Sequence, residues 1–224
     1  MEPTTREALL AELVRDGYLK SPSVTRAFAA VDRAVFVPVE RKEEAYGNYP
    51  LPIGYGQTIS QPLTVAFMLE LLDAKPGEKV LEVGAGSGWQ TALLSNIVGS
   101  EGTVIGMERL PELVSLAERN IAEAKVAPLP KAAGEASEEV PAPENIRLVL
   151  GDGSLGFSEG APYDRIIAAA AANTIPPAWK EELRIGGRIV APIRESIMVL
   201  TKTAHDAFEI RQYFGFSFVP LVKD

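Results

Sequence analysis

The segment from Val80 to Gly88, Val-Leu-Glu-Val-Gly-Ala-Gly-Ser-Gly, constrains the fold of this chain more than any other stretch. A short, mainly apolar run ends in three glycines spaced G-x-G-x-G, and a helical pattern follows them. Glycine allows a positive φ in a sharp turn, and its missing Cβ lets the backbone approach a ligand. The amides at the start of the next helix favour negative charge. The segment therefore predicts a buried strand, a tight ligand-binding turn and a helix.

A regular alternation of strands and helices continues from residue 63. The last two expected strands have no helical pattern between them, so they form a hairpin. We therefore predict an α/β fold: a Rossmann-like, seven-stranded and mainly parallel sheet, covered on both faces, with a C-terminal antiparallel hairpin. Helices are expected at 63–73, 89–98, 111–124 and 177–183, and strands at 79–83, 103–107, 146–150, 165–169, 188–192, 196–202 and 210–217.

The first 62 residues form an N-terminal helical extension followed by a loop. Apolar spacing indicates one helix over 5–17 and a second that begins at Ser21 or Ser23. Residues 46–62 are rich in glycine and proline and predict a long structured loop, which in a compact chain is usually functional. We expect a single domain over 1–224, with the helices and a substrate and cofactor loop in 1–62 and the α/β core in 63–224.

One segment interrupts the alternation. Residues 125–144 have little apolar content, and the run from 128 to 141 contains three prolines. Such a composition cannot bury enough apolar surface to form ordered structure. We expect a flexible surface insertion there, because the alternation resumes directly afterwards.

Composition excludes several kinds of site. The chain has no cysteine and one histidine, so thiolate nucleophiles, cysteine zinc sites and multi-histidine metal sites are excluded. His205 is expected in an exposed polar turn. The formal net charge of −8 disfavours nucleic-acid binding, and no apolar run reaches the ~20 residues of a membrane span. The N-terminus carries no secretory signal pattern, so we expect a cytoplasmic location. We also expect a monomer without metal, nucleic-acid or membrane partners.

Three carboxylates lie at or near the carboxyl ends of strands that we expect to be neighbours: Glu82, Glu108 and Asp152. Each alone is also typical of a solvated turn or a helix cap, but the carboxyl ends of parallel strands meet at one edge of the sheet. There Glu108 is suited to accept both ribose hydroxyls of a nucleoside, and Asp152 to accept the adenine amino group. A dinucleotide site needs G-x-G-x-x-G, whereas Trp89 stands at the last position. The pattern favours S-adenosylmethionine as cofactor.

The string Pro50 to Pro62, Pro-Leu-Pro-Ile-Gly-Tyr-Gly-Gln-Thr-Ile-Ser-Gln-Pro, resembles the hallmark loop of the protein-L-isoaspartate (D-aspartate) O-methyltransferase family. The resemblance extends along the chain, with only residues 125–144 outside it. It implies methyl transfer from S-adenosylmethionine to the free carboxylate of L-isoaspartyl and D-aspartyl residues in damaged proteins and peptides, which initiates repair. The other similar segments are 35–38, 84–92, 106–113, 151–153, 161–167 and 218–221.

The resemblance also implies roles for individual residues. Ser60 is the expected catalytic residue, whose hydroxyl would hydrogen-bond the incoming carboxylate. Its position before Pro62, taken alone, favours a helix cap, and only the surrounding hallmark string favours the catalytic role. Since a carboxylate is ionised at neutral pH, catalysis needs alignment and exclusion of water rather than a strong base. Expected cofactor residues are Thr58, Ile59, Ser60, Glu82, Gly84, Gly86, Ser87, Gly88, Glu108, Arg109, Asp152 and Gly153; expected substrate residues are Ser60, Val219, Pro220 and Leu221.

Three positions depart from the family pattern. Gly47 stands where an acidic residue is frequent, Ala169 where threonine is usual, and Arg194 where glycine is expected. Because these positions are expected on the substrate side, two alternatives stay open. One is an O-methyltransferase of the same scaffold that acts on another peptide or small-molecule carboxylate. The other is a cofactor-binding module without transfer activity.

Overall fold

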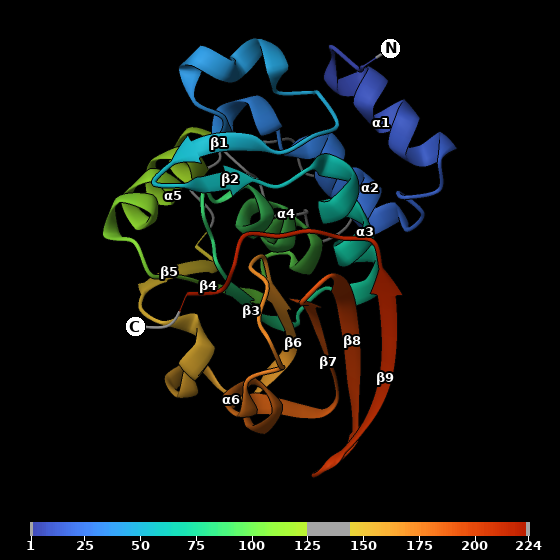
Figure 1. The fold of residues 1–224 in the computed structure, drawn as a ribbon, viewed down its shortest axis with the longest axis vertical. Coiled ribbons are helices and arrows are strands. Elements are labelled where there is room, and N and C mark those ends of the chain that lie inside the picture. The colour runs from blue at the N-terminus through green and yellow to red at the C-terminus, as the bar shows by residue number, and fades with distance from the viewer. Residues whose placement is uncertain (1, 125–143, 223–224) are drawn as a thin grey trace.

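The computed structural model describes residues 2–124 and 144–222, so the expected flexible insertion lies, except for Glu144, outside the described residues. Two helices, two short 3-10 turns and a small hairpin precede the α/β part (Figure 1). These elements are α1 (Arg6–Arg15), α2 (Pro22–Ala30), η1 (Arg33–Phe36), η2 (Val39–Glu44), β1 (Leu51–Gly54) and β2 (Gln57–Ile59). The rest are α3 (Pro62–Leu72), β3 (Lys79–Val83), α4 (Trp89–Val98), β4 (Thr103–Glu108), α5 (Pro111–Ala124), β5 (Ile146–Leu150), η3 (Gly153–Leu155), η4 (Ser158–Gly160), β6 (Tyr163–Ala168), α6 (Pro177–Glu182), β7 (Leu183–Ile193), β8 (Ser196–Ala204) and β9 (Ala207–Phe214).

The large sheet has seven strands in the order β5-β4-β3-β6-β7-β8-β9. Strands β5, β4, β3, β6 and β7 are parallel, and β8 and β9 close the sheet as an antiparallel hairpin. The predicted fold class is confirmed. The order reverses between β3 and β6, because the chain first builds outward to β5 and then returns to the other side of β3. In open α/β sheets such a reversal creates a crevice outside the carboxyl ends of the strands.

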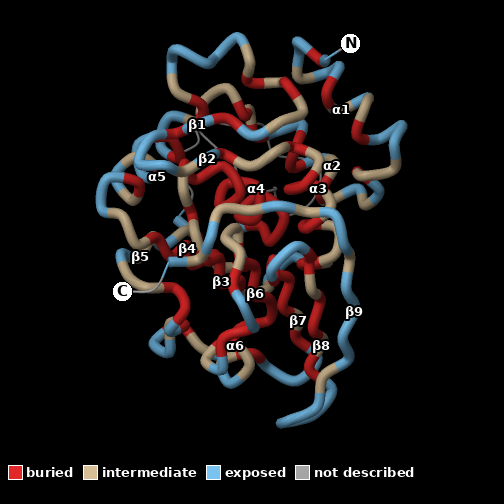
Figure 2. The backbone as a smooth tube through the Cα atoms, in the orientation of Figure 1, coloured by how far each residue is buried: buried red, intermediate tan, exposed pale blue. Residues whose placement is uncertain are grey.

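Alternate side chains of the central strands enter two separate apolar cores. In β3, Leu81 and Val83 belong to the same core as Trp179 of α6, whereas Val80 belongs to the core under the helices on the opposite face. Helices α3, α4 and α5 cover that opposite face. Figure 2 shows buried residues concentrated in the central strands and α4, and an exposed β9 at the sheet edge. Burial on both faces explains why the central strands read as continuous apolar runs.

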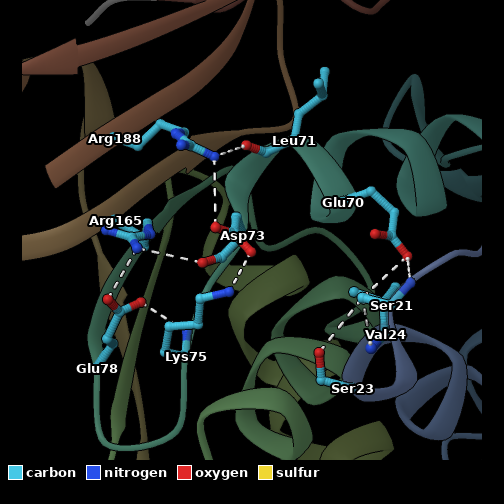
Figure 3. Close-up of polar contacts among 10 residues, drawn as sticks. All are labelled: Ser21, Ser23, Val24, Glu70, Leu71, Asp73, Lys75, Glu78, Arg165 and Arg188. Atoms are coloured by element: carbon cyan, nitrogen blue, oxygen red, sulfur yellow. Dashed lines mark hydrogen bonds and ion pairs between the residues drawn. The ribbon is translucent and has the colours of Figure 1, made fainter.

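A polar network joins the α3–β3 connection to the amino edge of the sheet (Figure 3). Arg165 of β6 lies 3.0 Å from Glu78, whose other oxygen accepts a 2.7 Å hydrogen bond from the amide of Lys75. Arg188 of β7 donates to the carbonyl of Leu71 at the end of α3, at 2.7 Å. These contacts anchor the sheet at the edge opposite to the carboxyl-end crevice.

The start of the second helix is settled by a cap. Ser21 is the N-cap of α2, and its hydroxyl accepts from the amide of Val24 at 3.4 Å, with Pro22 at the first helical position. The turn between β8 and β9 holds His205, which is 91% exposed and 3.0 Å from Asp206, as predicted. Within the described part of the chain, no helix is long and apolar enough to cross a membrane.

Three predicted segments differ most from the structure. Strand β7 begins at Leu183 rather than at residue 188, and it includes the last residue of the helix predicted over 177–183. Residues 46–62 are not a plain loop, because they contain the β1–β2 hairpin, in which Leu51 pairs with Ile59. The last strand is β9 at 207–214 rather than 210–217, and residues 215–222 leave the sheet. Within this segment, residues 217–222 form a C-terminal strap that crosses the carboxyl edge of the sheet (Figure 1). It is fixed by Ala171, which donates to the carbonyl of Val219 at 2.8 Å and accepts from the amide of Leu221 at 2.7 Å.

Candidate functional site

The glycine turn lies at the carboxyl end of β3, at the crevice. Gly84, Gly86 and Gly88 have φ angles of 89°, 55° and 88°, in the left-handed region that L side chains rarely adopt. The amides of Gly84 and Ala85 donate to the carbonyl of Met107 at 2.8 and 3.0 Å, which fixes the turn to β4. The expectation of positive φ is confirmed at all three glycines.

Glu108 ends β4 directly beside this turn. One carboxylate oxygen accepts from the amide of Gly86 at 3.0 Å. The other accepts from the amides of Arg109 and Leu110 at 2.8 and 3.1 Å. The carboxylate is thereby held rigidly at the wall of a cavity, as a ligand acceptor must be.

Glu82 lies beneath the turn and is completely buried. Its two oxygens accept from the hydroxyl of Thr91 at 2.5 Å and from the side-chain Nε2 of Gln90 at 3.1 Å, both in the first turn of α4. Burial raises the pKa of Glu82 to about 8, against the two hydrogen bonds, which act in the opposite direction. At neutral pH this carboxyl is therefore largely protonated.

Asp152 has a local structural role. Its Oδ1 accepts from the amide of Ser154 at 2.8 Å and caps η3. The flanking residues Gly151 and Gly153 line a cavity, but Asp152 is not among the residues that line it. The backbone on either side of the carboxylate, rather than the carboxylate, borders that space.

Three cavities around Gly84 form one cleft at the carboxyl ends of the strands. The main cavity, of about 380 Å³, lies between the β1–β2 hairpin, the glycine turn and the C-terminal strap. A second, of about 60 Å³, and a third, of about 40 Å³, share Gly84 and further lining residues with it. Of the expected site residues, Thr58, Ser60, Gly84, Gly86, Glu108 and Val219 line the main cavity, Arg109, Gly153, Pro220 and Leu221 the second, and Ile59, Glu82 and Ser87 the third.

Two expected cofactor residues lie apart from these cavities. Asp152 caps η3, and Gly88 is the N-cap of α4. A Cβ at Gly88 would lie 3.1 Å from Ala117 and from Ile121, which is tighter than an ordinary contact, so glycine favours the packing of α5 against the turn. The third glycine of the motif thus has a packing reason independent of any ligand.

Ser60 connects β2 to α3 and does not cap the helix. The N-cap is Gln61, which makes no side-chain cap bond, and Pro62 begins the helix. The amide of Leu63 instead donates to Oδ1 of Asn48 at 3.0 Å. Over residues 2–124 and 144–222 the Ser60 hydroxyl has no hydrogen-bond partner, and Ser60 lines both the main and the third cavity. The interpretation of Ser60 as a cap is wrong, because Asn48 occupies that position in space.

The three departures have different structural settings. A Cβ at Gly47 would lie 2.4 Å from the ring of Tyr49, so this glycine accommodates the tyrosine. Ala169 lines the main and third cavities without a polar side chain. Arg194 is exposed in the β7–β8 turn with φ 54°, a conformation that favours glycine.

Several site residues were missed in the sequence. Gln57 and Ala170 each line both the main and the second cavity, and Phe218 lines the main one. Gln57 lies inside the hallmark string, so its position in the sequence was a signal that it belongs to the site. Arg33 is 2% exposed and was also missed. Its place in a mainly apolar stretch of sequence was a usable signal that this arginine is buried.

Comparison with known proteins identifies the family of the chain. The family model described as protein-L-isoaspartate(D-aspartate) O-methyltransferase matches residues 4–224. The chain belongs to this family. A protein-L-isoaspartate O-methyltransferase of Methanothrix thermoacetophila is 44% identical over 205 residues, 90% of this chain and 89% of its own. One of Ignicoccus hospitalis is 39% identical over the full length of both chains.

The fold agrees with solved structures of the same family. A structure from Plasmodium falciparum, assigned to protein-L-isoaspartate O-methyltransferase and in complex with S-adenosyl-L-homocysteine, has a TM-score of 0.82 and 25% identity, and covers 99% of this chain and 100% of that one. The family resemblance predicted from the hallmark loop is confirmed.

Proposed function

We propose that the protein transfers a methyl group from S-adenosylmethionine to the free carboxylate of L-isoaspartyl and D-aspartyl residues in damaged proteins and peptides, which initiates their repair. Membership of the family over residues 4–224 supports the reaction. The observation that carries the proposal is the cleft, where Ser60 from the hallmark loop and Glu108 beside the glycine turn line one cavity of about 380 Å³.

The residues present fit the cofactor. A cavity of this size lies within the ~300–1,000 Å³ range of small-molecule sites. A nucleoside ribose needs a rigid carboxylate acceptor, and Glu108 is held by three backbone amides. An adenine ring needs a narrow apolar slot, and the second cavity is bordered by Met107, Leu110 and Gly153. When bound, S-adenosylmethionine supplies a sulfonium methyl group, which forms a carbon–oxygen bond with the substrate carboxylate as the carbon–sulfur bond breaks and its electron pair stays on sulfur.

The chain itself has to bind, orient and exclude water. The Ser60 hydroxyl, free of protein partners among the described residues, is available to donate to the substrate carboxylate. The C-terminal strap covers the crevice beside it through the backbone bonds of Ala171. No strong base is required, because the substrate carboxylate is already ionised near pH 7. Holding the reacting groups in line supplies the rate enhancement.

The remaining expectations belong to this proposal. We propose direct cofactor contacts for the expected cofactor residues that line the cleft other than Glu82. For Glu82 we propose support of the first turn of α4, for Gly88 packing of the glycine turn against α5, and for Asp152 support of η3. A single domain over 1–224, a monomeric state, cytoplasmic location and independence of nucleic acid and membranes stay predictions. The net charge of −8 supports independence of nucleic acid, because nucleic-acid affinity depends on neutralisation of the phosphates by basic side chains.

The decisive experiment compares two peptides that differ only in isoaspartate or aspartate at one position. Purified protein is incubated with methyl-labelled S-adenosylmethionine, and transfer to each peptide is measured. We expect labelling of the isoaspartyl peptide alone. Equal labelling of both peptides would favour a broader carboxyl methyltransferase, and cofactor binding without any transfer would favour a binding module; either result would reject the proposed function.

A further inference from the structure

Arg33, at the start of η1, is a buried arginine without a carboxylate partner among the described residues. It is 2% exposed. Burial lowers its pKa to about 10, which leaves the guanidinium charged at neutral pH. Taking an unpaired charge out of water is costly unless hydrogen bonds replace the lost hydration. The position therefore demands an explanation that packing alone does not give.

Four backbone carbonyl oxygens replace the missing counter-ion. Nη1 donates to the carbonyls of Ala45 and Gly47, at 2.7 and 3.2 Å. Nη2 donates to the carbonyls of Tyr49 and Ser60, each at 3.1 Å. The first three carbonyls precede β1 and the fourth follows β2. Arg33 thus joins the two chain segments at the base of the hairpin that borders the cleft.

The same guanidinium also faces the cofactor turn. Its central carbon lies 5.3 Å from the ring centroid of Trp89, within the range of a cation–π contact. Trp89 is the first residue of α4, directly after Gly88, and is 2% exposed. One side chain therefore touches both the carbonyl of Ser60 and the helix that begins at the glycine turn.

We propose that Arg33 is a positioning residue that holds Ser60 in register with the glycine turn. The inference rests on the proposed function of Ser60. Arg33 does not line any of the three cavities of the cleft, so it acts through the residues that do. The guanidinium suits this task because its donors form a rigid planar fork that reaches several acceptors at once. A misplacement of about 1 Å at a reacting group costs roughly 100-fold in rate.

The test uses two substitutions of Arg33 and one control. Arg33→Lys keeps the charge without the planar fork, and Arg33→Gln removes the charge. The control, Arg188→Gln, also removes a cation that donates to a backbone carbonyl, but at the amino edge of the sheet (Figure 3). For each protein we would measure kcat and KM on the isoaspartyl peptide, the Kd of S-adenosylhomocysteine, the Tm, and hydrogen exchange over residues 57–61.

In Arg33→Gln we expect kcat to fall about 10- to 100-fold, with the Kd of S-adenosylhomocysteine within threefold of wild type. In Arg33→Lys kcat should fall less than in Arg33→Gln, and in both variants the backbone amides of residues 57–61 should exchange hydrogen faster than in wild type. Arg188→Gln should lower Tm with kcat within twofold. If Arg33→Gln does not fold, Arg33→Lys decides alone. An unchanged kcat in the variants, or the same kcat loss in the control, overturns the proposal.

The exchange measurement separates this inference from the proposed function. A wild-type protein that shows no transfer to the isoaspartyl peptide would defeat the function, yet exchange over 57–61 requires no turnover. Faster exchange there in both Arg33 variants, absent from Arg188→Gln, would still support the positioning role. Exchange equal to that of wild type would overturn it.

Discussion

Ser60 illustrates how a residue of ambiguous sequence signature is resolved by its neighbours. A serine two positions before a helix-starting proline has the pattern of a cap. In the structure Asn48, 15 positions away from Leu63, provides the cap acceptor, and the Ser60 hydroxyl is left to the cavity. Sequence spacing alone contains no information on a cap donated from a distant segment, so only the family resemblance pointed away from the cap.

Substitution of Ser60 tests its role directly. Ser60→Ala should lower kcat about 10- to 100-fold, because one hydrogen bond to a charged group contributes about 1.5–3 kcal/mol. The Kd of S-adenosylhomocysteine should change less than threefold. Ser217→Ala is the matched control, since Ser217 lines the same cavity from the C-terminal strap. Equal kcat values for wild type and Ser60→Ala would remove the serine from the reaction.

Glu82 predicts a pH dependence of stability. Its folded pKa of about 8 lies above the ordinary value of 4.5, so between these values the folded protein holds a proton that the unfolded chain has lost. Stability relative to Glu82→Gln should therefore fall as pH rises from 4.5 to 8, by about 1.4 kcal/mol per pH unit. Denaturant unfolding of both proteins across this range measures the difference, in which all other groups cancel. Parallel curves would mean that Glu82 is ionised in the folded protein.

At the scale of elements, strongly patterned segments were predictable and short or exposed ones were not. The bounds of β3 and α4 agree with the prediction, because an apolar run, three glycines and an apolar helix follow one another without ambiguity. The β1–β2 hairpin was missed, since Pro52, Gly54 and Gly56 obscure strands of only four and three residues. The shift of β9 has a different cause. Its alternating apolar residues Phe208, Ile210 and Phe214 are half-buried or exposed, and Phe216 and Phe218 continue the same alternation beyond the strand, so the pattern does not mark where the strand ends.

The cap of α3 predicts a coupled loss of stability and activity. Asn48→Ala removes the acceptor for the backbone amide of Leu63 and the 2.8 Å hydrogen bond that the side-chain Nδ2 of Asn48 donates to Glu12. We expect a loss of about 1 kcal/mol in the free energy of unfolding, hence roughly 2–4 °C in Tm, and a lower kcat because α3 begins two residues after Ser60. Thermal unfolding and peptide methylation measure the two effects.

A second cap serves as the control for Asn48. The hydroxyl of Thr5 accepts from the amide of Ala8 at 3.2 Å at the start of α1, and no residue of that helix lines the cleft cavities. Thr5→Ala should therefore lower Tm by no more than Asn48→Ala does and leave kcat unchanged. A loss of kcat in both variants would attribute the effect to general destabilisation rather than to the position of α3.

At the scale of the whole molecule, the cleft is built from three parts that are distant in sequence. The hairpin contributes Thr58, the carboxyl edge of the sheet contributes Gly84 and Glu108, and the C-terminal strap contributes Val219. The sheet edge was predictable from motif positions. The strap was predictable only as a set of similar residues, because its placement depends on the backbone pairing with Ala171, which no side-chain pattern reports.

A ligand that touches all three parts should stabilise the protein as a unit. At a free concentration of S-adenosylhomocysteine 100 times its Kd, binding to the folded state alone adds about 2.7 kcal/mol. For a chain of 224 residues this corresponds to a rise in Tm of roughly 5–11 °C. Thermal unfolding at increasing ligand concentration measures the rise, and a single cooperative transition is expected throughout.

Glu108 decides whether this stabilisation comes from the proposed site. Glu108→Gln removes the carboxylate that is held beside the glycine turn, so at the same ligand concentration its rise in Tm should be markedly smaller than that of wild type. Glu112→Gln makes the same chemical change at an exposed position in the first turn of α5 and should respond as wild type does. Among the described residues that line the main cavity, Glu108 is the one carboxylate. If wild type and both variants showed the same rise in Tm, the ligand would therefore bind elsewhere.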